Sequence, residues 1–502
     1  MEDEQFIKDQ EKLVKNKELN IWEALIPVIA LIVMLAYNVY VYGEDSLNGS
    51  NQFILLLGAA VAAIVGIYNK VSFDEMVEEV AINIKSTSGA ILILLMVGAL
   101  AGTWLISGVI PTMIYYGLQI LNPTIFLPAC VVICAVISVA TGSSWTTSAT
   151  VGIALIGIAE ALGVPLGMTA GAVISGAYFG DKMSPLSDTT NLAPAIAGAG
   201  LFEHIRYMTI TTVPTMIITL IVFIILGLNL DITGITDTHV MLNAMKSTFT
   251  ITPWLFVVPI LVILLIVKKT PPLIALLFGT LLGGLAALIF QPELVAMIAG
   301  SEFLTFRSGY VGIMNAITVE TSIPTEIEML SSLFTSGGMA GMLGTIWLII
   351  CAMTFGGVMD AIGALTRISQ ALLNLFHTTF GLFASTVLSC LAINVTAADQ
   401  YLAIVVPGKM FSKAFTDKNL DPVNLSRTLE DTGTVTSVLV PWNTCGAYQS
   451  GVLGVPTLDY FAYAVFNYVS PFMTLTVAAL GYKIKTLGDG KHHSPKPVSA
   501  EA

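Results

Sequence analysis

Apolar runs of about 20 residues recur along this chain, and each is long enough to cross the hydrocarbon core of a bilayer as a helix. Only 11% of the residues are charged, whereas a soluble domain carries roughly 25%. The sequence therefore predicts an all-α polytopic membrane protein surrounded by a lipid bilayer. Clear candidate spans are residues 22–42, 52–68, 88–110, 207–228, 252–267, 272–290, 340–365 and 458–482.

Four further apolar stretches are interrupted midway by hydroxyl, amide, glycine or proline residues. Broken helices are tolerated at membrane depth only where they line a cavity inside the protein. We predict re-entrant hairpins at 123–161 and 379–413, and broken spans at 164–200 and 421–455. A separate amphipathic helix is expected at 73–87, lying on the inner face of the membrane.

The two halves of the chain share a register. Trp22 and Pro27 match Trp254 and Pro259, and Thr141 matches Thr396, which lies 255 residues later. Five spans and one hairpin in each half make the repeats inverted, with broken helices at the midplane, as in many transporters. The predicted segments are a cytoplasmic N-terminal tail (1–20), a first inverted repeat (21–228), an external connecting loop (229–251), a second inverted repeat (252–485) and a disordered C-terminal tail (486–502).

Lysine and arginine collect at alternate ends of the predicted spans, for example at Lys70, Lys85, Lys268 and Arg367. The excess of positive charge on one side predicts a multi-pass protein of the cytoplasmic membrane with its N-terminus in the cytoplasm. The net charge of −12 argues against a nucleic-acid partner. No nucleotide-binding P-loop is apparent, and we expect no cofactor.

Charged residues interrupt the apolar sequence between Tyr178 and Pro194. Asp181, Lys182 and Asp188 lie there at expected membrane depth, where each charge costs several kcal/mol, so the cluster is a functional-site hypothesis by default. An intramembrane aspartyl protease would require a Gly-x-Gly-Asp sequence, which Tyr178-Phe179-Gly180-Asp181 does not match. We therefore predict a transporter and not an enzyme.

The polar breaks offer oxygen atoms, which Na⁺ prefers as ligands. A carboxylate adds charge and can bind a proton instead, so competition at one carboxylate would exchange Na⁺ for H⁺. We place that competition at Asp188. Other roles stay open: an ion pair of Asp181 with Lys182, helix capping by Asp188 or Asp399, and a cytoplasmic vestibule in which Asp431 and Glu430 face Arg427.

The segment from Gly180 to Pro194, GDKMSPLSDTTNLAP, resembles the hallmark of the NhaC family of sodium/proton antiporters, and TGSSW at 141–145 also resembles a family segment. The resemblance implies Na⁺/H⁺ antiport and, through a broader superfamily of dicarboxylate carriers, an elevator-type motion and a homodimer. Relatives similar to malate/lactate exchangers or amino-acid carriers keep a small organic anion or amino acid open as the substrate. This sequence lacks the Ser-Asn-Thr triplet that the dicarboxylate carriers have at their hairpin tips.

The resemblance and the polar breaks together indicate two groups of site residues. The predicted Na⁺ ligands are Ser144, Thr146, Ser187, Asp188, Thr189 and Asn191 in the first half, and Asn394, Thr396, Asn443 and Thr444 in the second. The predicted residues for proton coupling or charge tuning are Asp181, Lys182, Asp188, Asp399 and Asp431.

Overall fold

The computed structural model describes residues 19–42, 49–120, 122–230, 238–268, 270–325, 331, 333–375 and 378–487. The predictions for most of the N-terminal tail, most of the C-terminal tail and part of the external loop therefore lie outside the described residues. Within the described part, the only strands are β1 (Thr321–Ser322) and β2 (Thr335–Ser336), which pair antiparallel.

The predicted helical membrane class is confirmed. In the described part of the chain, nine helices are long and apolar enough to cross a membrane, or ten if one bent pair counts as a span. They are α2 (Ile21–Tyr42), α3 (Ser50–Tyr68), α4 (Phe73–Ile106), α6 (Pro123–Thr141), the segment Ser144–Leu162, α11 (Leu201–Leu228), α14 (Pro272–Phe290), the segment Gly338–Ala361 and α21 (Thr379–Thr396). The bent pair joins α12 (Thr238–Thr248) to η3 (Pro253–Phe256) and α13 (Val257–Val267).

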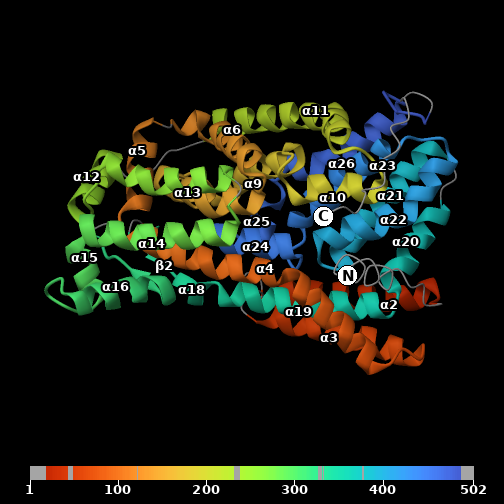
Figure 1. Cartoon of the computed structure of the whole chain (residues 1–502), viewed down its shortest axis with the longest axis horizontal. Coiled ribbons are helices and arrows are strands. Elements are labelled where there is room, and N and C mark those ends of the chain that lie inside the picture. Colours follow the sequence, from red (N-terminus) through yellow and green to blue (C-terminus); the bar gives the residue numbers. More distant parts are fainter. Residues whose placement is uncertain are drawn as a thin grey trace, which may run out of the picture.

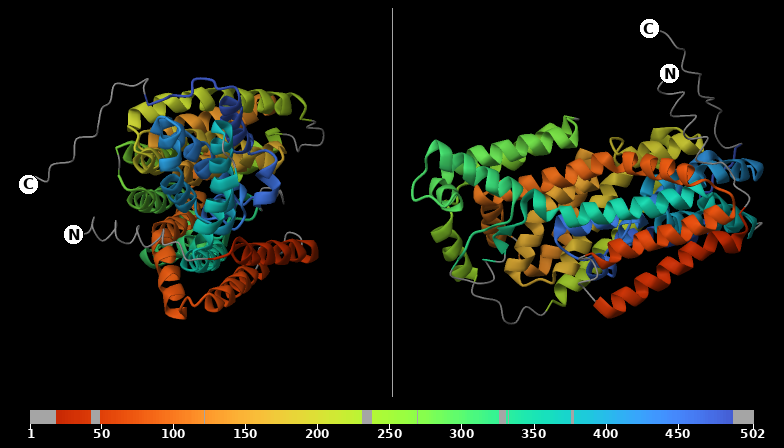
Figure 2. Two further views of the ribbon diagram at one scale, coloured as in Figure 1. Left: turned by 90° about the vertical axis from the view of Figure 1, so that its right-hand side faces the viewer. Right: turned by 90° about the horizontal axis from the view of Figure 1, so that it is seen from below.

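Most of the long helices run along the longest axis of the molecule (Figure 1). Helices α2 and α3 lie at one edge of the bundle and α11 at the opposite edge, as two perpendicular views agree (Figure 2). The segment Gly338–Ala361 consists of α18 (Gly338–Gly341) and α19 (Leu343–Ala361). The other helices outside the four polar breaks are α5 (Val109–Ile120), α15 (Pro292–Ile298), α16 (Phe306–Thr318), α20 (Ala364–Leu375), α25 (Thr457–Phe461) and α26 (Val465–Ala479). The inverted order of the two repeats stays a prediction.

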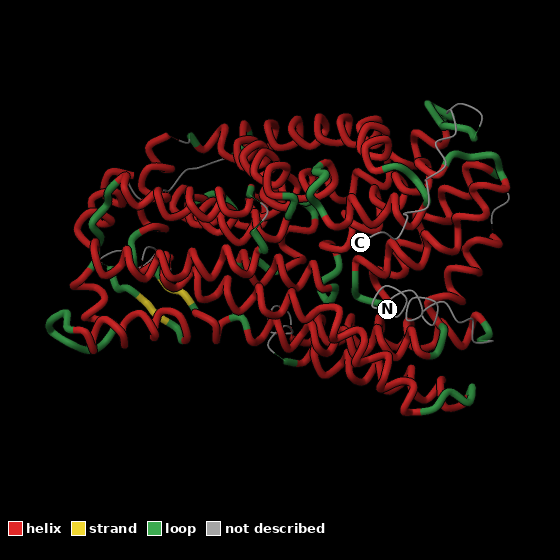
Figure 3. The backbone as a smooth tube through the Cα atoms, in the orientation of Figure 1, coloured by secondary structure: helices red, strands yellow, loops and turns green. Residues whose placement is uncertain are grey.

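All four predicted polar breaks are present, and loop segments lie in the interior of the bundle between helix ends (Figure 3). In the segment predicted as the first re-entrant hairpin, the helix breaks between α6 and α7 (Ser144–Thr147) and continues through η2 (Ser148–Gly152) and α8 (Ile153–Leu162). The re-entrant course of both hairpins stays a prediction. The first broken span consists of α9 (Leu166–Met183) and α10 (Asp188–Ala197). The second hairpin consists of α21 and α22 (Gln400–Asp417), and the second broken span of α23 (Pro422–Leu429), η4 (Glu430–Thr434), η5 (Ser437–Leu439) and α24 (Thr444–Leu453).

Local capping explains where the helices restart. Gly142 ends α6 with a φ of 73°, a left-handed conformation that glycine adopts without steric cost. The side chains of Ser143, Asp399 and Asn443 then accept hydrogen bonds from backbone N–H groups in the first turns of α7, α22 and α24. Serine, aspartate and asparagine are preferred at this position because they satisfy otherwise unpaired amide groups.

The prediction of a separate surface helix at 73–87 is wrong, because α4 is one helix of 34 residues. Ser72 begins it with a reciprocal capping box to Glu75. The polar run from Ser86 to Ser88 does not interrupt it, since each hydroxyl donates to a carbonyl three residues earlier in the same helix. The continuous helix thereby carries Thr87 to a buried position, while Ser86 beside it stays exposed.

Close packing of α6 against α9 positions the first break. A methyl group added at Gly176 would lie 2.3 Å from the carbonyl oxygen of Val131, so only glycine permits this approach. Cys134 of α6 also faces Gly176. One turn further along α6, the hydroxyl of Ser138 donates a hydrogen bond to the carbonyl of Ala177 at 2.5 Å. This contact sets the distance between the first hairpin tip and the end of α9.

Gly176→Ala should lower the free energy of unfolding by about 1–3 kcal/mol, because overpacking forces backbone shifts. Thermal unfolding in detergent measures the effect. Gly344→Ala is the matched control, since Gly344 also lies in a helix and a methyl group there meets nothing within 4 Å. Equal melting temperatures for the two variants would contradict the packing argument.

Candidate functional site

The four polar breaks meet at one cavity of about 590 Å³. Thr141 and Ser143 reach it from the first hairpin tip, Asp188 from the first broken span, Asp399 from the second tip and Thr444 from the second broken span. Helix α4 and the turn at 270–272 complete the wall. Residues from all four polar breaks therefore border one cavity.

Asp181 joins the first hairpin tip to the first broken span. Its carboxylate accepts a hydrogen bond from the Ser144 backbone N–H at 2.9 Å and a second one from the Ser144 hydroxyl. The hydroxyl of Thr190 donates to the backbone carbonyl of Asp181, across the break. Hydrogen bonds to a charged acceptor are stronger than neutral ones, so Asp181 holds the tip while one side of it borders the cavity.

Asp188 is the exposed carboxylate of the cavity. It is the first residue of α10, and Ser187 occupies the N-cap position, so the predicted capping role of Asp188 is wrong. No hydrogen bond reaches the Asp188 carboxylate from the described residues, although Ser187 and Thr189 share one between their hydroxyls at 3.1 Å. The helix N-terminus favours negative charge at this place.

Asp399 has the capping role that the sequence left open. Its Oδ1 accepts the Leu402 backbone N–H at 3.0 Å and so begins α22. The same residue lines the cavity beside Gln400 and Tyr401, two residues that the sequence reasoning missed. The signal for Gln400 was its position directly after a predicted hairpin tip.

In the second half, amide groups take the place of the carboxylate. Asn443 Nδ2 donates to the carbonyl of Asn394 at 3.0 Å, and Asn394 Nδ2 donates to the carbonyl of Gly433 at 2.9 Å. The backbone N–H of Thr444 donates to the carbonyl of Ala398 at 2.9 Å. These bonds fasten the second tip to the second broken span.

The predicted site residues thus fall into two groups. Asp181, Ser187, Asp188, Thr189, Asp399 and Thr444 line the cavity. The others lie outside its lining: Ser144, Thr146, Asn191, Asn394, Thr396, Asn443, Lys182 and Asp431. Several of these make local bonds, as Asn191 does to the carbonyls of Pro185 and Ser187.

Lys182 pairs with Asp431, and not with its sequence neighbour Asp181. Both side chains of the pair are fully buried. Ser470 accepts a hydrogen bond from the Lys182 ammonium at 2.8 Å, and Thr474 donates to the Asp431 carboxylate. The predicted ion pair with Asp181 is wrong because adjacent residues of a helix do not face each other.

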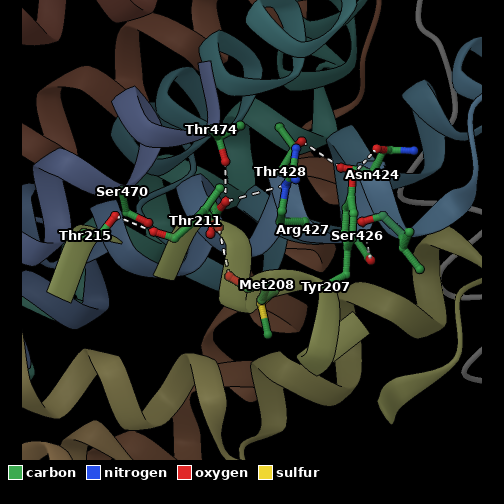
Figure 4. A network of polar contacts seen from close by, with 12 residues as sticks. Tyr207, Met208, Thr211, Thr215, Asn424, Ser426, Arg427, Thr428, Ser470 and Thr474 are labelled. Atoms are coloured by element: carbon green, nitrogen blue, oxygen red, sulfur yellow. Dashed lines mark hydrogen bonds and ion pairs between the residues drawn. The ribbon is translucent and has the colours of Figure 1, made fainter. Parts of the chain in front are cut away.

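The predicted cytoplasmic vestibule around Arg427, Glu430 and Asp431 is also wrong, because all three side chains are fully buried. The guanidinium of Arg427 lies 4.0 Å from Asp431 and stacks over the ring of Tyr207, 4.6 Å from its centroid. Figure 4 shows Arg427 on α23 between Tyr207 of α11 and Thr474 of α26. Segments from both halves of the chain therefore share one buried polar network.

Comparisons with known proteins decide the family. Residues 176–482 match the family model described as "Na+/H+ antiporter family". Over 440 residues the chain is 38% identical to the protein named Na(+)/H(+) antiporter NhaC of Alkalihalophilus pseudofirmus, covering 88% of this chain and 91% of that one. The chain belongs to the Na⁺/H⁺ antiporter family. The resemblance seen in the segment from Gly180 to Pro194 is confirmed.

Two other proteins similar to this chain have names that include organic substrates. The chain is 35% identical to the Malate-2H(+)/Na(+)-lactate antiporter of Bacillus subtilis, over 86% of this chain and 88% of that one. It is 33% identical to the Arginine/ornithine antiporter ArcD of Halobacterium salinarum, over 93% of this chain and 94% of that one. Antiporters with different named substrates are thus similar to this chain along most of its length.

The buried pair should show strong energetic coupling. Lys182→Met and Asp431→Asn should each lower the free energy of unfolding by about 3–5 kcal/mol, because each removes one partner of a fully buried ion pair, and Arg427 approaches Asp431 only to 4.0 Å. The double variant should lose less than the sum of the two. A double-mutant cycle by thermal unfolding measures the difference.

The exposed pair of Lys485 with Glu203, at 2.7 Å, is the control. Lys485→Met should change stability by less than about 1 kcal/mol. Additive losses from Lys182→Met and Asp431→Asn would show that the buried contact contributes no coupling.

Proposed function

We propose that this protein exchanges Na⁺ for H⁺ across the cell membrane, and that Na⁺ binds in the cavity. The observation that carries the proposal is the Asp188 carboxylate, which borders the cavity and accepts no hydrogen bond from the described residues. A carboxylate without donors keeps its lone pairs for a cation. Membership of the antiporter family supports the same conclusion.

Neutral oxygen ligands for Na⁺ are available beside Asp188. Ser187 and Thr444, which carry hydroxyl groups, line the cavity, and Asp399 adds a second carboxylate to the lining. The same carboxylates take up a proton when Na⁺ leaves, and this competition couples the two ions. A carrier of this kind needs only that its empty, charged form seldom changes conformation.

The cavity also suggests a direction. Its lining residues Ser86 and Thr87 follow Lys85, and Thr270 lies two residues after Lys268. Both lysines mark the cytoplasmic side by the positive-inside rule. We propose that the structure is open to the cytoplasm, that the N-terminus is cytoplasmic, and that a homodimer moves its cavity across the membrane by an elevator-type motion.

Asp188→Asn should abolish Na⁺-driven proton movement, because an amide binds Na⁺ more weakly and does not titrate. Proteoliposomes that contain a pH-sensitive dye report proton movement after addition of NaCl alone. Asp417→Asn is the control, since Asp417 is exposed at the end of α22, away from the cavity lining. Near-normal exchange by Asp188→Asn would remove Asp188 from the mechanism.

The size of the cavity favours a second candidate function, the transport of a small organic molecule coupled to Na⁺ or H⁺. About 590 Å³ lies in the range of small-molecule sites. Three carboxylates border the cavity, and none of the described residues that line it is a lysine or arginine. This lining fits a cationic amino acid better than an organic anion such as malate or lactate.

The same proteoliposomes separate the two functions. If NaCl alone moves protons, the plain antiporter is supported. If proton movement requires a gradient of arginine, ornithine, malate or lactate, the organic carrier is supported and the plain antiporter is contradicted. A response to the basic amino acids and not to the acids would agree with the charge of the cavity.

A further inference from the structure

Glu430 is a buried carboxylate that the transport site described above does not use. It begins the π-helical segment η4, and its side chain is fully buried. Neither of its carboxyl oxygens has a hydrogen-bond partner. Buried carboxylates are normally paired or hydrogen-bonded, or they bind a metal ion. π-Helical turns are rare and occur frequently at functional sites.

Other oxygen atoms lie around this carboxylate. The hydroxyls of Thr189 and Thr434 are beside it, and the Thr434 hydroxyl also lacks a hydrogen-bond partner. Thr189 is also one of the residues that line the cavity, so one side chain connects the surroundings of Glu430 with the cavity.

Glu430 has charged neighbours but no ion-pair partner among the described residues. Lys182 and Asp181 of α9 act on it electrostatically. Both cationic groups make their ion pairs with Asp431 instead: Lys182 is paired with Asp431, and Arg427 also faces Asp431. An uncompensated buried charge is strongly destabilising.

The neighbouring carboxylates have close polar contacts that Glu430 lacks. Asp181 accepts two hydrogen bonds from Ser144, and Asp431 has contacts with Lys182 and Thr474. Neither Glu430 oxygen has a hydrogen-bond partner of normal geometry, although the Thr189 and Thr434 hydroxyls lie beside the carboxylate. Carboxylate and hydroxyl oxygens are the ligands preferred by hard cations such as Na⁺.

We propose that Glu430, with the hydroxyls of Thr189 and Thr434, forms a second Na⁺ site, buried behind the cavity and separate from the ion at Asp188. The ion neutralises the Glu430 carboxylate, which has no ion-pair partner among the described residues. The proposal rests on Na⁺ being an ion that this protein binds, and adds a site at which Na⁺ is fully enclosed by protein.

Binding of ²²Na⁺ to the purified full-length protein tests this site without a transport step. Asp188→Asn should lose one ion per chain and retain one. Adding Glu430→Gln in that background should remove the remaining ion. Asp360→Asn is the matched control for the second change, because Asp360 is another buried carboxylate with an unpartnered oxygen, on α19. It should leave the remaining ion in place.

Loss of all Na⁺ binding in Asp188→Asn alone would overturn the second site, and so would unchanged binding after Glu430→Gln. If Glu430→Gln does not fold, Thr434→Val in the Asp188→Asn background provides the test. It removes one ligand and keeps the charge, and should weaken the remaining site by about tenfold; unchanged affinity would overturn the proposal.

Exchange by the wild-type protein is measured separately in the proteoliposomes. Absence of Na⁺-driven proton movement there, together with two bound Na⁺ ions, would contradict the proposed transport function and support the Glu430 site. Normal exchange with a single bound ion would support the transport function and overturn the Glu430 site.

Discussion

Helix ends cannot be left unpaired inside a membrane, and the structure around the cavity depends on this constraint. Each hairpin tip is fastened to the broken span of its own half. In the first half, Ser144 bonds to Asp181; in the second, Asn443 bonds to Asn394. The polar groups at each tip thus find hydrogen-bond partners on a broken span. The cavity lies between these four breaks.

The two halves solve this problem with different chemistry. The first half uses a carboxylate and the second uses amides, so negative charge gathers on one side of the cavity. The exception is Asp399, which caps α22 while it borders the cavity. Aromatic contact also crosses between the halves, since Trp145 of the first tip stacks on Tyr448 of α24 with ring centroids 3.9 Å apart. The two halves therefore share the pattern of polar breaks but differ in the charge of the groups that fasten the tips.

The polar breaks could be predicted from the sequence because the residues that end and restart helices are local signals. Gly142, Ser143 and Asn443 act within a turn of their own position. The partner of Lys182 could not be predicted in this way, since Asp431 lies in the other half of the chain. The continuity of α4 was missed for a related reason: the hydroxyls of its polar run bond to their own helix, which composition alone does not show. The sequence left open a cytoplasmic vestibule for Glu430, because its burial depends on how α23 and η4 pack against other parts of the chain.

The pairing of Lys182 with Asp431 has a consequence for biosynthesis. The ribosome completes Lys182 long before it reaches Asp431, and domains in general fold from the N-terminal end as they emerge. A lysine without its partner is expensive in hydrocarbon. The end of α9 therefore obtains the charge partner of Lys182 only after the second half has been synthesised. The ion pair that joins the first broken span to the second is accordingly a late event in the assembly of this chain.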